Sequence, residues 1–341
     1  MNTKNQMKRS IPRFFIPALT LFVLATTWGC KGDGGSGNEF EDSLSNSQSV
    51  AYNLFDADSA YEYIAAQVAF GTRIPNTPTH KACGDWLKQK LASFGFDVIS
   101  QEATVVDQEG KNLPITNIIG QWNPQAERRI LLLAHWDTRP IADHDPDPSK
   151  TGMPILGADD AASGVGVLLE VARQLAKQQS SLGVDILLVD AEDSGTSENE
   201  ESWCLGSTYW SKNPHKAGYR AEFGILLDMV GAQDAKFRWE LFSKLHAPSI
   251  VSTFWDKAAS LGYGSYFIQA DGAGLTDDHR PIIDNLAIPT IDIVNYDPAR
   301  PKGFGTHWHT HADTMEIIDR ATLRAVGETL ISYLKDLEEV R

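Results

Sequence analysis

The chain has 341 residues, of which 42% are hydrophobic and 22% are charged, an ordinary composition for a soluble globular protein with a sizeable core. Its formal net charge of −15 argues against nucleic acid as a partner, because binding to phosphates requires clusters of Lys and Arg. An acidic surface also tolerates neutral or cationic peptides better than anionic ones, although most acidic proteins are acidic merely for solubility.

The first 29 residues are typical of a signal peptide. Four basic residues precede an apolar run at positions 14–25 (FFIPALTLFVLA), which is too short to span a bilayer comfortably. We therefore predict that residues 1–29 direct export and are removed. Their removal takes away four positive charges and no negative ones, so the net charge falls from −15 to −19.

Cys30 follows Gly29 directly after this run, a pattern that resembles a bacterial lipoprotein processing site. The stretch at 31–38 (KGDGGSGN) is typical of a flexible tether. We expect residues 30–48 to comprise a lipidated Cys30 and its tether, with membrane contact through the lipid alone. The protein is then a cell-envelope lipoprotein, either facing the periplasm or in the outer membrane. The alternative is a plain secretory signal with an incidental cysteine.

Two cysteines, Cys83 and Cys204, remain for the folded part. They could pair in an oxidising envelope, but the sequence does not give their separation in space. No Cys-x-x-Cys motif is present, so a zinc site built from thiolates is excluded.

A single domain is expected over residues 49–341, because no repeat or second linker interrupts this region. Hydrophobic periodicity distinguishes its helices from its strands, and four short apolar runs are typical of central strands covered on both faces. In chain order the predicted elements are helices at 57–70 and 80–94, strands at 96–106, 113–122 and 129–135, a helix at 161–177, strands at 184–192 and 223–230, a helix at 249–261, a strand at 289–296 and a helix at 320–340. This order predicts an α/β protein, a three-layer α/β/α sandwich with a mixed central sheet.

Ionisable side chains stand at or after the carboxyl ends of the four apolar runs: His135 and Asp137, Glu192 and Asp193, Asp228, and His309 after a loop. Ligands in open α/β sheets bind at this edge. Residues placed there by four separate strands therefore predict an active site.

Asp and His together are the ligand types expected of zinc, and a catalytic zinc site keeps one position open. Glu192 and Asp193 provide two adjacent carboxylates, of which one can bind a metal while the other carries protons. For this pair alone, a structural role as salt-bridge partners is the alternative. The further candidates His135, Asp160, Asp228 and His309 favour a metal site.

Five motifs follow the order found in zinc aminopeptidases with the M28-type fold: AHWD at 134–137, GADDAASGVG at 157–166, DAED at 190–193, LLDMVG at 226–231 and HTHADT at 309–314. Within that clan the chain most resembles the glutaminyl cyclases, animal-type zinc enzymes that also occur in bacteria. Further stretches carry this resemblance, which covers about residues 50–340: HWDTRPIADHDPDP at 135–148, ESWCLGSTYW at 201–210, DDHRP at 277–281 and WHTHADT at 308–314. It implies a zinc aminopeptidase-like fold, also called phosphorylase/hydrolase-like.

The resemblance implies one zinc ion per chain, held by Asp160, Asp193 and His309. It implies that Glu192 is the general acid/base and that the catalytic carboxylates Asp228 and Asp277 hold the substrate near it, with Asp278 as the alternative to Asp277. The aromatic residues in contact with substrate would be Trp308, Phe304 and Trp203. For Trp203 the more common role is that of an aromatic residue in the core or at the rim of the site. The chain departs from the usual family pattern at Asp193, where Glu is frequent.

Several nearby residues are expected to have no direct role. His135 and Asp228 occupy positions that bind a second zinc in related aminopeptidases, and the resemblance implies that they are free of metal here. The histidines flanking His309, His307 and His311, are expected at the surface. His144, in a loop rich in Pro and Asp, is expected to be solvated.

The implied activity is that of a glutaminyl-peptide cyclotransferase, an aminoacyltransferase that converts the amino-terminal Gln of peptides and proteins to pyroglutamate and releases ammonia. A two-zinc M28-type aminopeptidase is the enzymatic alternative, since all its ligand positions are filled. Trp308 directly before His309 and the DDH run at 277–279 favour the cyclase. A non-catalytic binding lipoprotein is a further alternative, against which the intact Glu192 argues.

Overall fold

The computed structural model describes residues 54–177 and 180–339. They belong to one compact unit, Ala51–Arg341. The predicted signal peptide, Cys30 and the tether lie outside the described residues. Within the described part, no helix is both long and apolar enough to cross a membrane.

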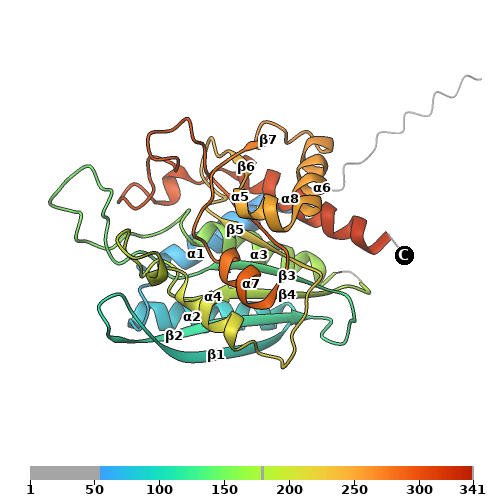
Figure 1. Cartoon of the computed structure of the whole chain (residues 1–341), viewed down its shortest axis with the longest axis horizontal. Helices are drawn as coiled ribbons and strands as arrows, with labels where there is room; N and C mark the ends of the chain where they lie inside the picture. The colour runs from blue at the N-terminus through green and yellow to red at the C-terminus, as the bar shows by residue number, and fades with distance from the viewer. Residues whose placement is uncertain (1–53, 178–179, 340–341) are drawn as a thin grey trace, which may run out of the picture. The chain divides into compact units, whose positions relative to one another are not determined.

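A six-stranded mixed sheet forms the centre of the unit (Figure 1). Its strands lie in the order β1 (Asp97–Val106), β2 (Asn112–Trp122), β4 (Gly183–Val189), β3 (Arg129–His135), β5 (Phe223–Asp228) and β8 (Thr290–Val294). β1 pairs antiparallel with β2, and β2 antiparallel with β4, whereas β4, β3, β5 and β8 run parallel. The four parallel strands therefore end at the same edge of the sheet.

Helices cover both faces of this sheet. One face packs against α1 (Ala57–Ala69), α2 (Pro78–Ser93), α3 (Ala162–Leu175), α6 (Pro248–Ser260) and α8 (Arg320–Glu339) in one large hydrophobic cluster. The other face packs against α4 (Leu205–Lys212) and α7 (His279–Leu286), which contact each other, around a second cluster. The predicted three-layer α/β/α sandwich is confirmed.

Smaller elements complete the unit. They are the parallel pair β6 (Phe237–Trp239) and β7 (Phe267–Asp271), helix α5 (Leu241–His246), and the 3₁₀ turns η1 (Glu200–Ser202) and η2 (Met315–Ile317). Cys83 and Cys204 are both buried and free.

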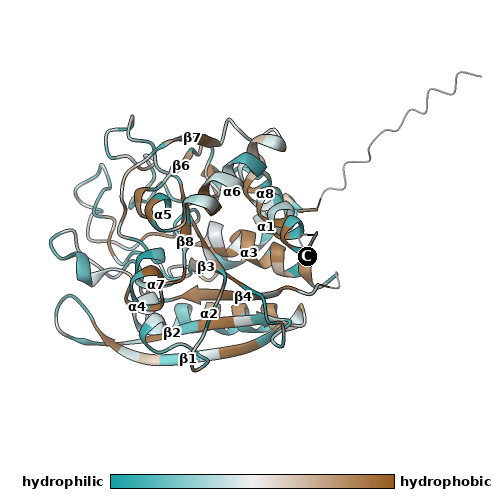
Figure 2. Cartoon of the chain, turned by 45° about the vertical axis from the view of Figure 1, so that its right-hand side comes forward, coloured by the Kyte–Doolittle hydropathy of each residue, from teal (hydrophilic) through white to brown (hydrophobic). Residues whose placement is uncertain are grey.

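The hydrophobic pattern of each strand matches its place in the sheet. Every residue of β3, β4, β5 and β8 is buried, as expected of strands covered on both faces. β1 lies at the edge, and its residues alternate between exposed and half-buried over most of its length. Figure 2 shows the contrast between the brown β4 and the mixed colours along β1.

Helix α3 packs closely against β5 because residue 164 is Gly. A Cβ at Gly164 would lie 2.2 Å from the main-chain oxygen of Leu227, so α3 or β5 would have to move. We expect Gly164→Ala to lower the free energy of unfolding by about 2–3 kcal/mol, measured by urea denaturation. Gly264→Ala is the matched control, since nothing lies within 4 Å of that added Cβ; equal stability of both variants would contradict this packing argument.

Candidate active site and metal centre

The residues predicted to act in catalysis, metal binding and substrate binding meet at the carboxyl edge of the parallel strands. All of them line one cavity of about 230 Å³: Asp160, Glu192, Asp193, Trp203, Asp228, Asp277, Phe304, Trp308 and His309. Asp228 ends β5, Glu192 and Asp193 follow β4, and His309 comes from the loop between β8 and η2. The cavity is therefore assembled from segments that lie far apart in the sequence.

Two histidines and three aspartates form the centre of this site. His309 Nε2 lies 3.3 Å from Asp193 Oδ1 and 3.7 Å from Asp160 Oδ2. His135 Nε2 lies 3.1 Å from Asp160 Oδ1 and 3.3 Å from Asp228 Oδ1. One ligand atom each of His135, Asp160 and Asp193 lie within 4.8 Å of one another, close enough to hold a metal ion.

The electrostatics of these groups suit a cation. Burial and the charge of Asp193 raise the pKa of Asp160 to about 6. Burial lowers the pKa of His309, but the charge of Asp193 and a hydrogen bond with Asp143 outweigh it and raise the value to about 9. A buried excess of carboxylates is costly unless a positive charge compensates it. The donor set of carboxylate oxygens and imidazole nitrogens is the one that zinc prefers.

Two further carboxylates fix the backbone that presents the central residues. Asp137 accepts hydrogen bonds from the N–H groups of Glu192 and Asp193, at 3.1 and 3.2 Å. Asp313 accepts from the N–H groups of Asp159 and Asp160, at 2.7 and 3.1 Å. Both side chains are fully buried, and Asp137 also lies 3.5 Å from His135 Nδ1, so the backbone of the site is held from inside the protein.

Arg139 and Asp143 hold the outer side of the site. The Arg139 guanidinium donates to the main-chain oxygens of Asp193 and Gly195, both at 2.9 Å, and to the Asp143 carboxylate. Asp143 Oδ1 in turn lies 3.2 Å from His309 Nδ1. An imidazole that binds a metal through one nitrogen is commonly oriented by a carboxylate at the other.

Glu192 lines the cavity, with its side chain 12% exposed. Burial and the neighbouring charge of Asp193 raise the pKa of Glu192 well above its usual value. Its carboxylate is 4.0 Å from His135 Nδ1 and 3.6 Å from the Cys204 thiol. A carboxyl group with a raised pKa in a cleft is a candidate for proton transfer.

Asp277 and Asp278 face different surroundings. Asp277 lines the cavity, whereas Asp278 accepts a hydrogen bond from Ser207 on α4. The sequence-based preference for Asp277 as the substrate-facing residue therefore agrees with the geometry. Behind Asp277 lies the fully buried His279, whose Nε2 is 3.2 Å from Glu240 and whose Nδ1 is 3.8 Å from Asp292.

Aromatic rings form the walls of the cavity. The Trp308 ring lies 4.1 Å from the His309 ring and 4.2 Å from the Phe304 ring, measured between centroids. Trp203 also stacks on His309, at 6.1 Å between ring centroids, and the Arg139 guanidinium lies 4.6 Å from the Trp203 ring centroid. These rings give the cavity that holds Glu192 and His309 a largely apolar wall.

The expectation for one of the outlying histidines was wrong. His307 is buried rather than at the surface, and its Nε2 lies 2.9 Å from Asp159, whose other oxygen accepts from backbone N–H groups. His144 is half-buried, with its ring 4.3 Å from the Trp308 ring. His311 is partly exposed and pairs with Asp145 at 2.8 Å. The interior position of His307 follows from a pairing with Asp159 that the sequence pattern does not reveal.

Residues 117–334 match the family described as Peptidase family M28. The chain belongs to peptidase family M28. A solved Porphyromonas gingivalis glutaminyl cyclase is 56% identical, with a TM-score of 0.83, covering 83% of this chain and 99% of that one. A Zn-dependent exopeptidase from Parabacteroides distasonis is 52% identical, with a TM-score of 0.81, covering 82% and 98%. The glutaminyl-peptide cyclotransferase of Drosophila melanogaster is 24% identical over 274 residues, which is 73% of each chain.

Sequence reasoning missed several residues that shape the site of this M28 domain. Arg139 stands inside the motif at 135–148, and Asp313 stands inside the motif at 309–314. These motifs were therefore a signal for both residues. Asp143 and Met229, which also borders the cavity, stand inside the motifs at 135–148 and 226–231 as well, although the motif does not show that Asp143 contacts His309. Their roles depend on loop geometry.

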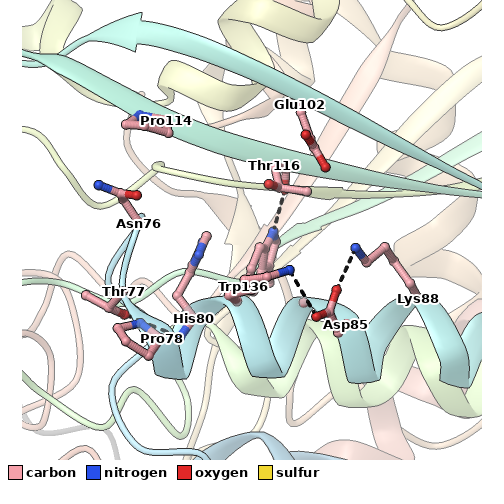
Figure 3. Close-up of a pocket in the computed structure, with 12 residues that line it drawn as sticks. Asn76, Thr77, Pro78, His80, Asp85, Lys88, Glu102, Pro114, Thr116 and Trp136 are labelled. Carbon is pink, nitrogen blue, oxygen red and sulfur yellow. Dashed lines mark hydrogen bonds and ion pairs between the residues drawn. The ribbon is translucent and has the colours of Figure 1, made fainter.

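A second cavity of the M28 domain, of about 510 Å³, lies between α2 and β2 (Figure 3). None of the predicted site residues lines it. His80 stacks on Trp136 at 4.1 Å and lies 2.9 Å from Asp190, which accepts the N–H of Ala191. His80 thus connects this cavity, through Asp190, to the segment that carries Glu192.

Proposed function

We propose that the protein is a glutaminyl-peptide cyclotransferase that converts the amino-terminal Gln of peptides and proteins to pyroglutamate, with release of ammonia. The observation that carries this proposal is the 56% identity to a solved glutaminyl cyclase. The match extends over 99% of the length of that cyclase. The local geometry supports it, because a proton-accepting Glu192 lies in a small cavity with aromatic walls.

In this proposal one zinc ion is held by Asp160, Asp193 and His309. Their ligand atoms lie close together, and Asp193 Oδ2 has no hydrogen-bond partner among the described residues. When bound at this site, zinc would act as a Lewis acid and polarise the side-chain carbonyl of the substrate Gln. The aromatic rings keep this carbonyl in a dry environment, where such electrostatic effects are strongest.

Glu192 carries the proton in the proposed reaction. The α-amine of the substrate attacks the side-chain amide carbon, and a new C–N bond forms as the bond to the amide nitrogen breaks. Glu192 accepts a proton from the attacking amine and returns it to the departing nitrogen, which leaves as ammonia. Water is not consumed, so the reaction balances with the peptide substrate alone.

Asp228 and Asp277 hold the amine of the substrate in this scheme. Both carboxylates line the cavity with Glu192. An amine between them is oriented by charge-assisted hydrogen bonds, which are stronger than neutral ones. Burial and the charge of Asp228 raise the pKa of Asp277 well above its usual value, so a cationic group beside the pair is favourable.

Asp143 has a positioning role that a single substitution tests. Asp143→Asn keeps the shape but weakens the contact with His309 Nδ1, so we expect zinc affinity to fall about 10–100-fold. Competition with a chelator measures this affinity. Asp147→Asn, an exposed residue on the same loop, is the control and should bind zinc as tightly as the parent protein. Unchanged affinity in Asp143→Asn would refute the role.

A two-zinc aminopeptidase is the second candidate function. His135, Asp160 and Asp228 form a second group of potential ligands, with His135 Nε2 within 3.1 and 3.3 Å of the two carboxylates. An enzyme of that kind uses water between two metals to cleave the peptide bond. The same protein sample distinguishes the two functions by its product.

The test of the proposal is incubation of the purified protein with the dipeptide Gln-Ala. We expect ammonia to be released in proportion to the dipeptide consumed, with release abolished by a chelator and restored by zinc. Release of free Gln and Ala without ammonia would favour the aminopeptidase and overturn the cyclase.

We also propose that the enzyme acts in the cell envelope, anchored by lipid on Cys30. This proposal rests on the basic and apolar start of the chain and on the Gly/Ser-rich stretch after Cys30.

A further inference from the structure

A groove between α4 and α7 opens directly from the catalytic cavity. The groove has a volume of about 490 Å³, and it shares four lining residues with that cavity: Glu200, Trp203, Thr276 and Asp277. Figure 1 shows α4 and α7 side by side, and the two helices contact each other. We call this space the α4–α7 groove.

We propose that the α4–α7 groove receives the residues that follow the amino-terminal Gln, and that its acidic rim favours a basic side chain among them. This inference rests on the proposed cyclase function. It adds a preference among substrates that the chemistry of the reacting Gln does not set.

The position of Asp277 gives the direction of the substrate chain. The catalytic cavity, at about 230 Å³, is smaller than ordinary ligand pockets, so the rest of a peptide must leave it. In the proposed reaction the α-amine lies beside Glu192 and Asp277, which places the α-carbon at the same point. Since Asp277 borders both spaces, the chain that continues from the α-carbon enters the groove.

The rim of the groove carries an excess of negative charge. Glu200, Glu201 and Asp284 are exposed there, and Lys212 and Arg280 are the basic residues that line the groove. Asp284 is within 3.5 Å of Arg280, whereas neither glutamate forms an ion pair with any residue that the structure describes. Two unpaired carboxylates are therefore available to a cationic side chain of the substrate.

A second route out of the catalytic cavity has the opposite charge. A space of about 470 Å³ beside Phe304 and Trp308 is lined by Arg300 and Lys302, with Asp234 as its one acidic residue. It shares only those two aromatic residues with the catalytic cavity, and Asp277 does not border it. If the substrate left by this route, the enzyme would favour acidic residues after the Gln. The measured preference for basic or acidic residues therefore distinguishes the two routes.

The experiment compares kcat/KM for three amidated peptides of equal length that differ only in the residue after Gln: Lys, Ala or Glu. Exposed ion pairs change affinities by up to about fivefold each. We therefore expect the Lys peptide to exceed the Glu peptide by about three- to tenfold, with the Ala peptide between them. The ratio should shrink as salt is added, since both glutamates are exposed.

Substitutions at Glu201 assign the preference to the groove. Glu201→Gln should reduce the ratio of Lys to Glu peptides, and Glu201→Lys should reduce it further or reverse it. Because each ratio is measured within one variant, any general loss of activity cancels. Glu127→Lys, an exposed residue shortly before β3 at the opposite end of the strands, should leave the ratio as in the parent protein.

The outcomes separate this inference from the proposed function. No ammonia from any of the three peptides would overturn the cyclase itself. Ammonia from all three with equal efficiency, a preference for Glu, or a ratio that Glu201→Lys does not change would overturn the α4–α7 groove as the substrate route while leaving the cyclase in place.

Discussion

Replacing Glu192 by Gln is expected to lower turnover of Gln peptides by at least about 100-fold, because general acid–base catalysis contributes about 10²–10⁴-fold. The amide keeps the size and shape of the side chain but cannot accept the proton of the attacking amine. Zinc should remain bound, since Glu192 is not among the proposed ligands. Turnover, zinc content and melting temperature are measured on the same preparation.

The three readouts distinguish a proton carrier from a structural carboxylate. A structural role predicts a lower melting temperature with little loss of rate, and a ligand role predicts loss of zinc. Glu198→Gln is the matched control, because Glu198 is exposed on the loop that follows Glu192 and should retain the parent rate. A near-normal rate for Glu192→Gln would require another proton carrier.

Removal of a zinc ligand is the second change with a large expected effect. Asp160→Ala or His309→Ala takes away a donor from a three-residue site, so zinc content should fall from about one per chain towards zero, and activity should fall with it. Metal analysis by mass spectrometry after gel filtration, alongside ammonia release, measures both quantities.

His135→Ala is the contrast that counts the metals. His135 lies 3.1 Å from Asp160 and 3.3 Å from Asp228, where a second zinc would bind in an aminopeptidase. A one-zinc cyclase should retain its zinc content in this variant. Loss of about one equivalent, from two in the parent protein, would contradict the one-zinc proposal.

The central strands of the sheet were predictable because strands that are buried on both faces consist of continuous apolar runs. β3 was predicted at Arg129–His135, the bounds that it has in the structure, and the ends of the other central strands were predicted to within three residues. The predicted ends of the longer helices also agree within three residues. By contrast, α4, α5 and α7, each of six to eight residues, were not predicted, since such short segments carry too few turns for a clear periodicity.

The convergence of the site residues was predictable, and the groups that support them were only partly so. Strand ends meet at one edge of a parallel sheet, which brings Asp228, Glu192 and Asp193 together whatever the loops do. The contact of Asp143 with His309 and of His307 with Asp159 depends on the path of long loops. No periodicity specifies such a path, so His307 was wrongly expected at the surface.

The central claim is tested most directly by the mass of the product formed from a longer peptide that begins with Gln. The account predicts a single product that retains every residue and has lost one molecule of ammonia, with its amino terminus blocked to sequencing and with free Gln absent. A product shortened by one residue, together with free Gln, would contradict the account and identify an aminopeptidase.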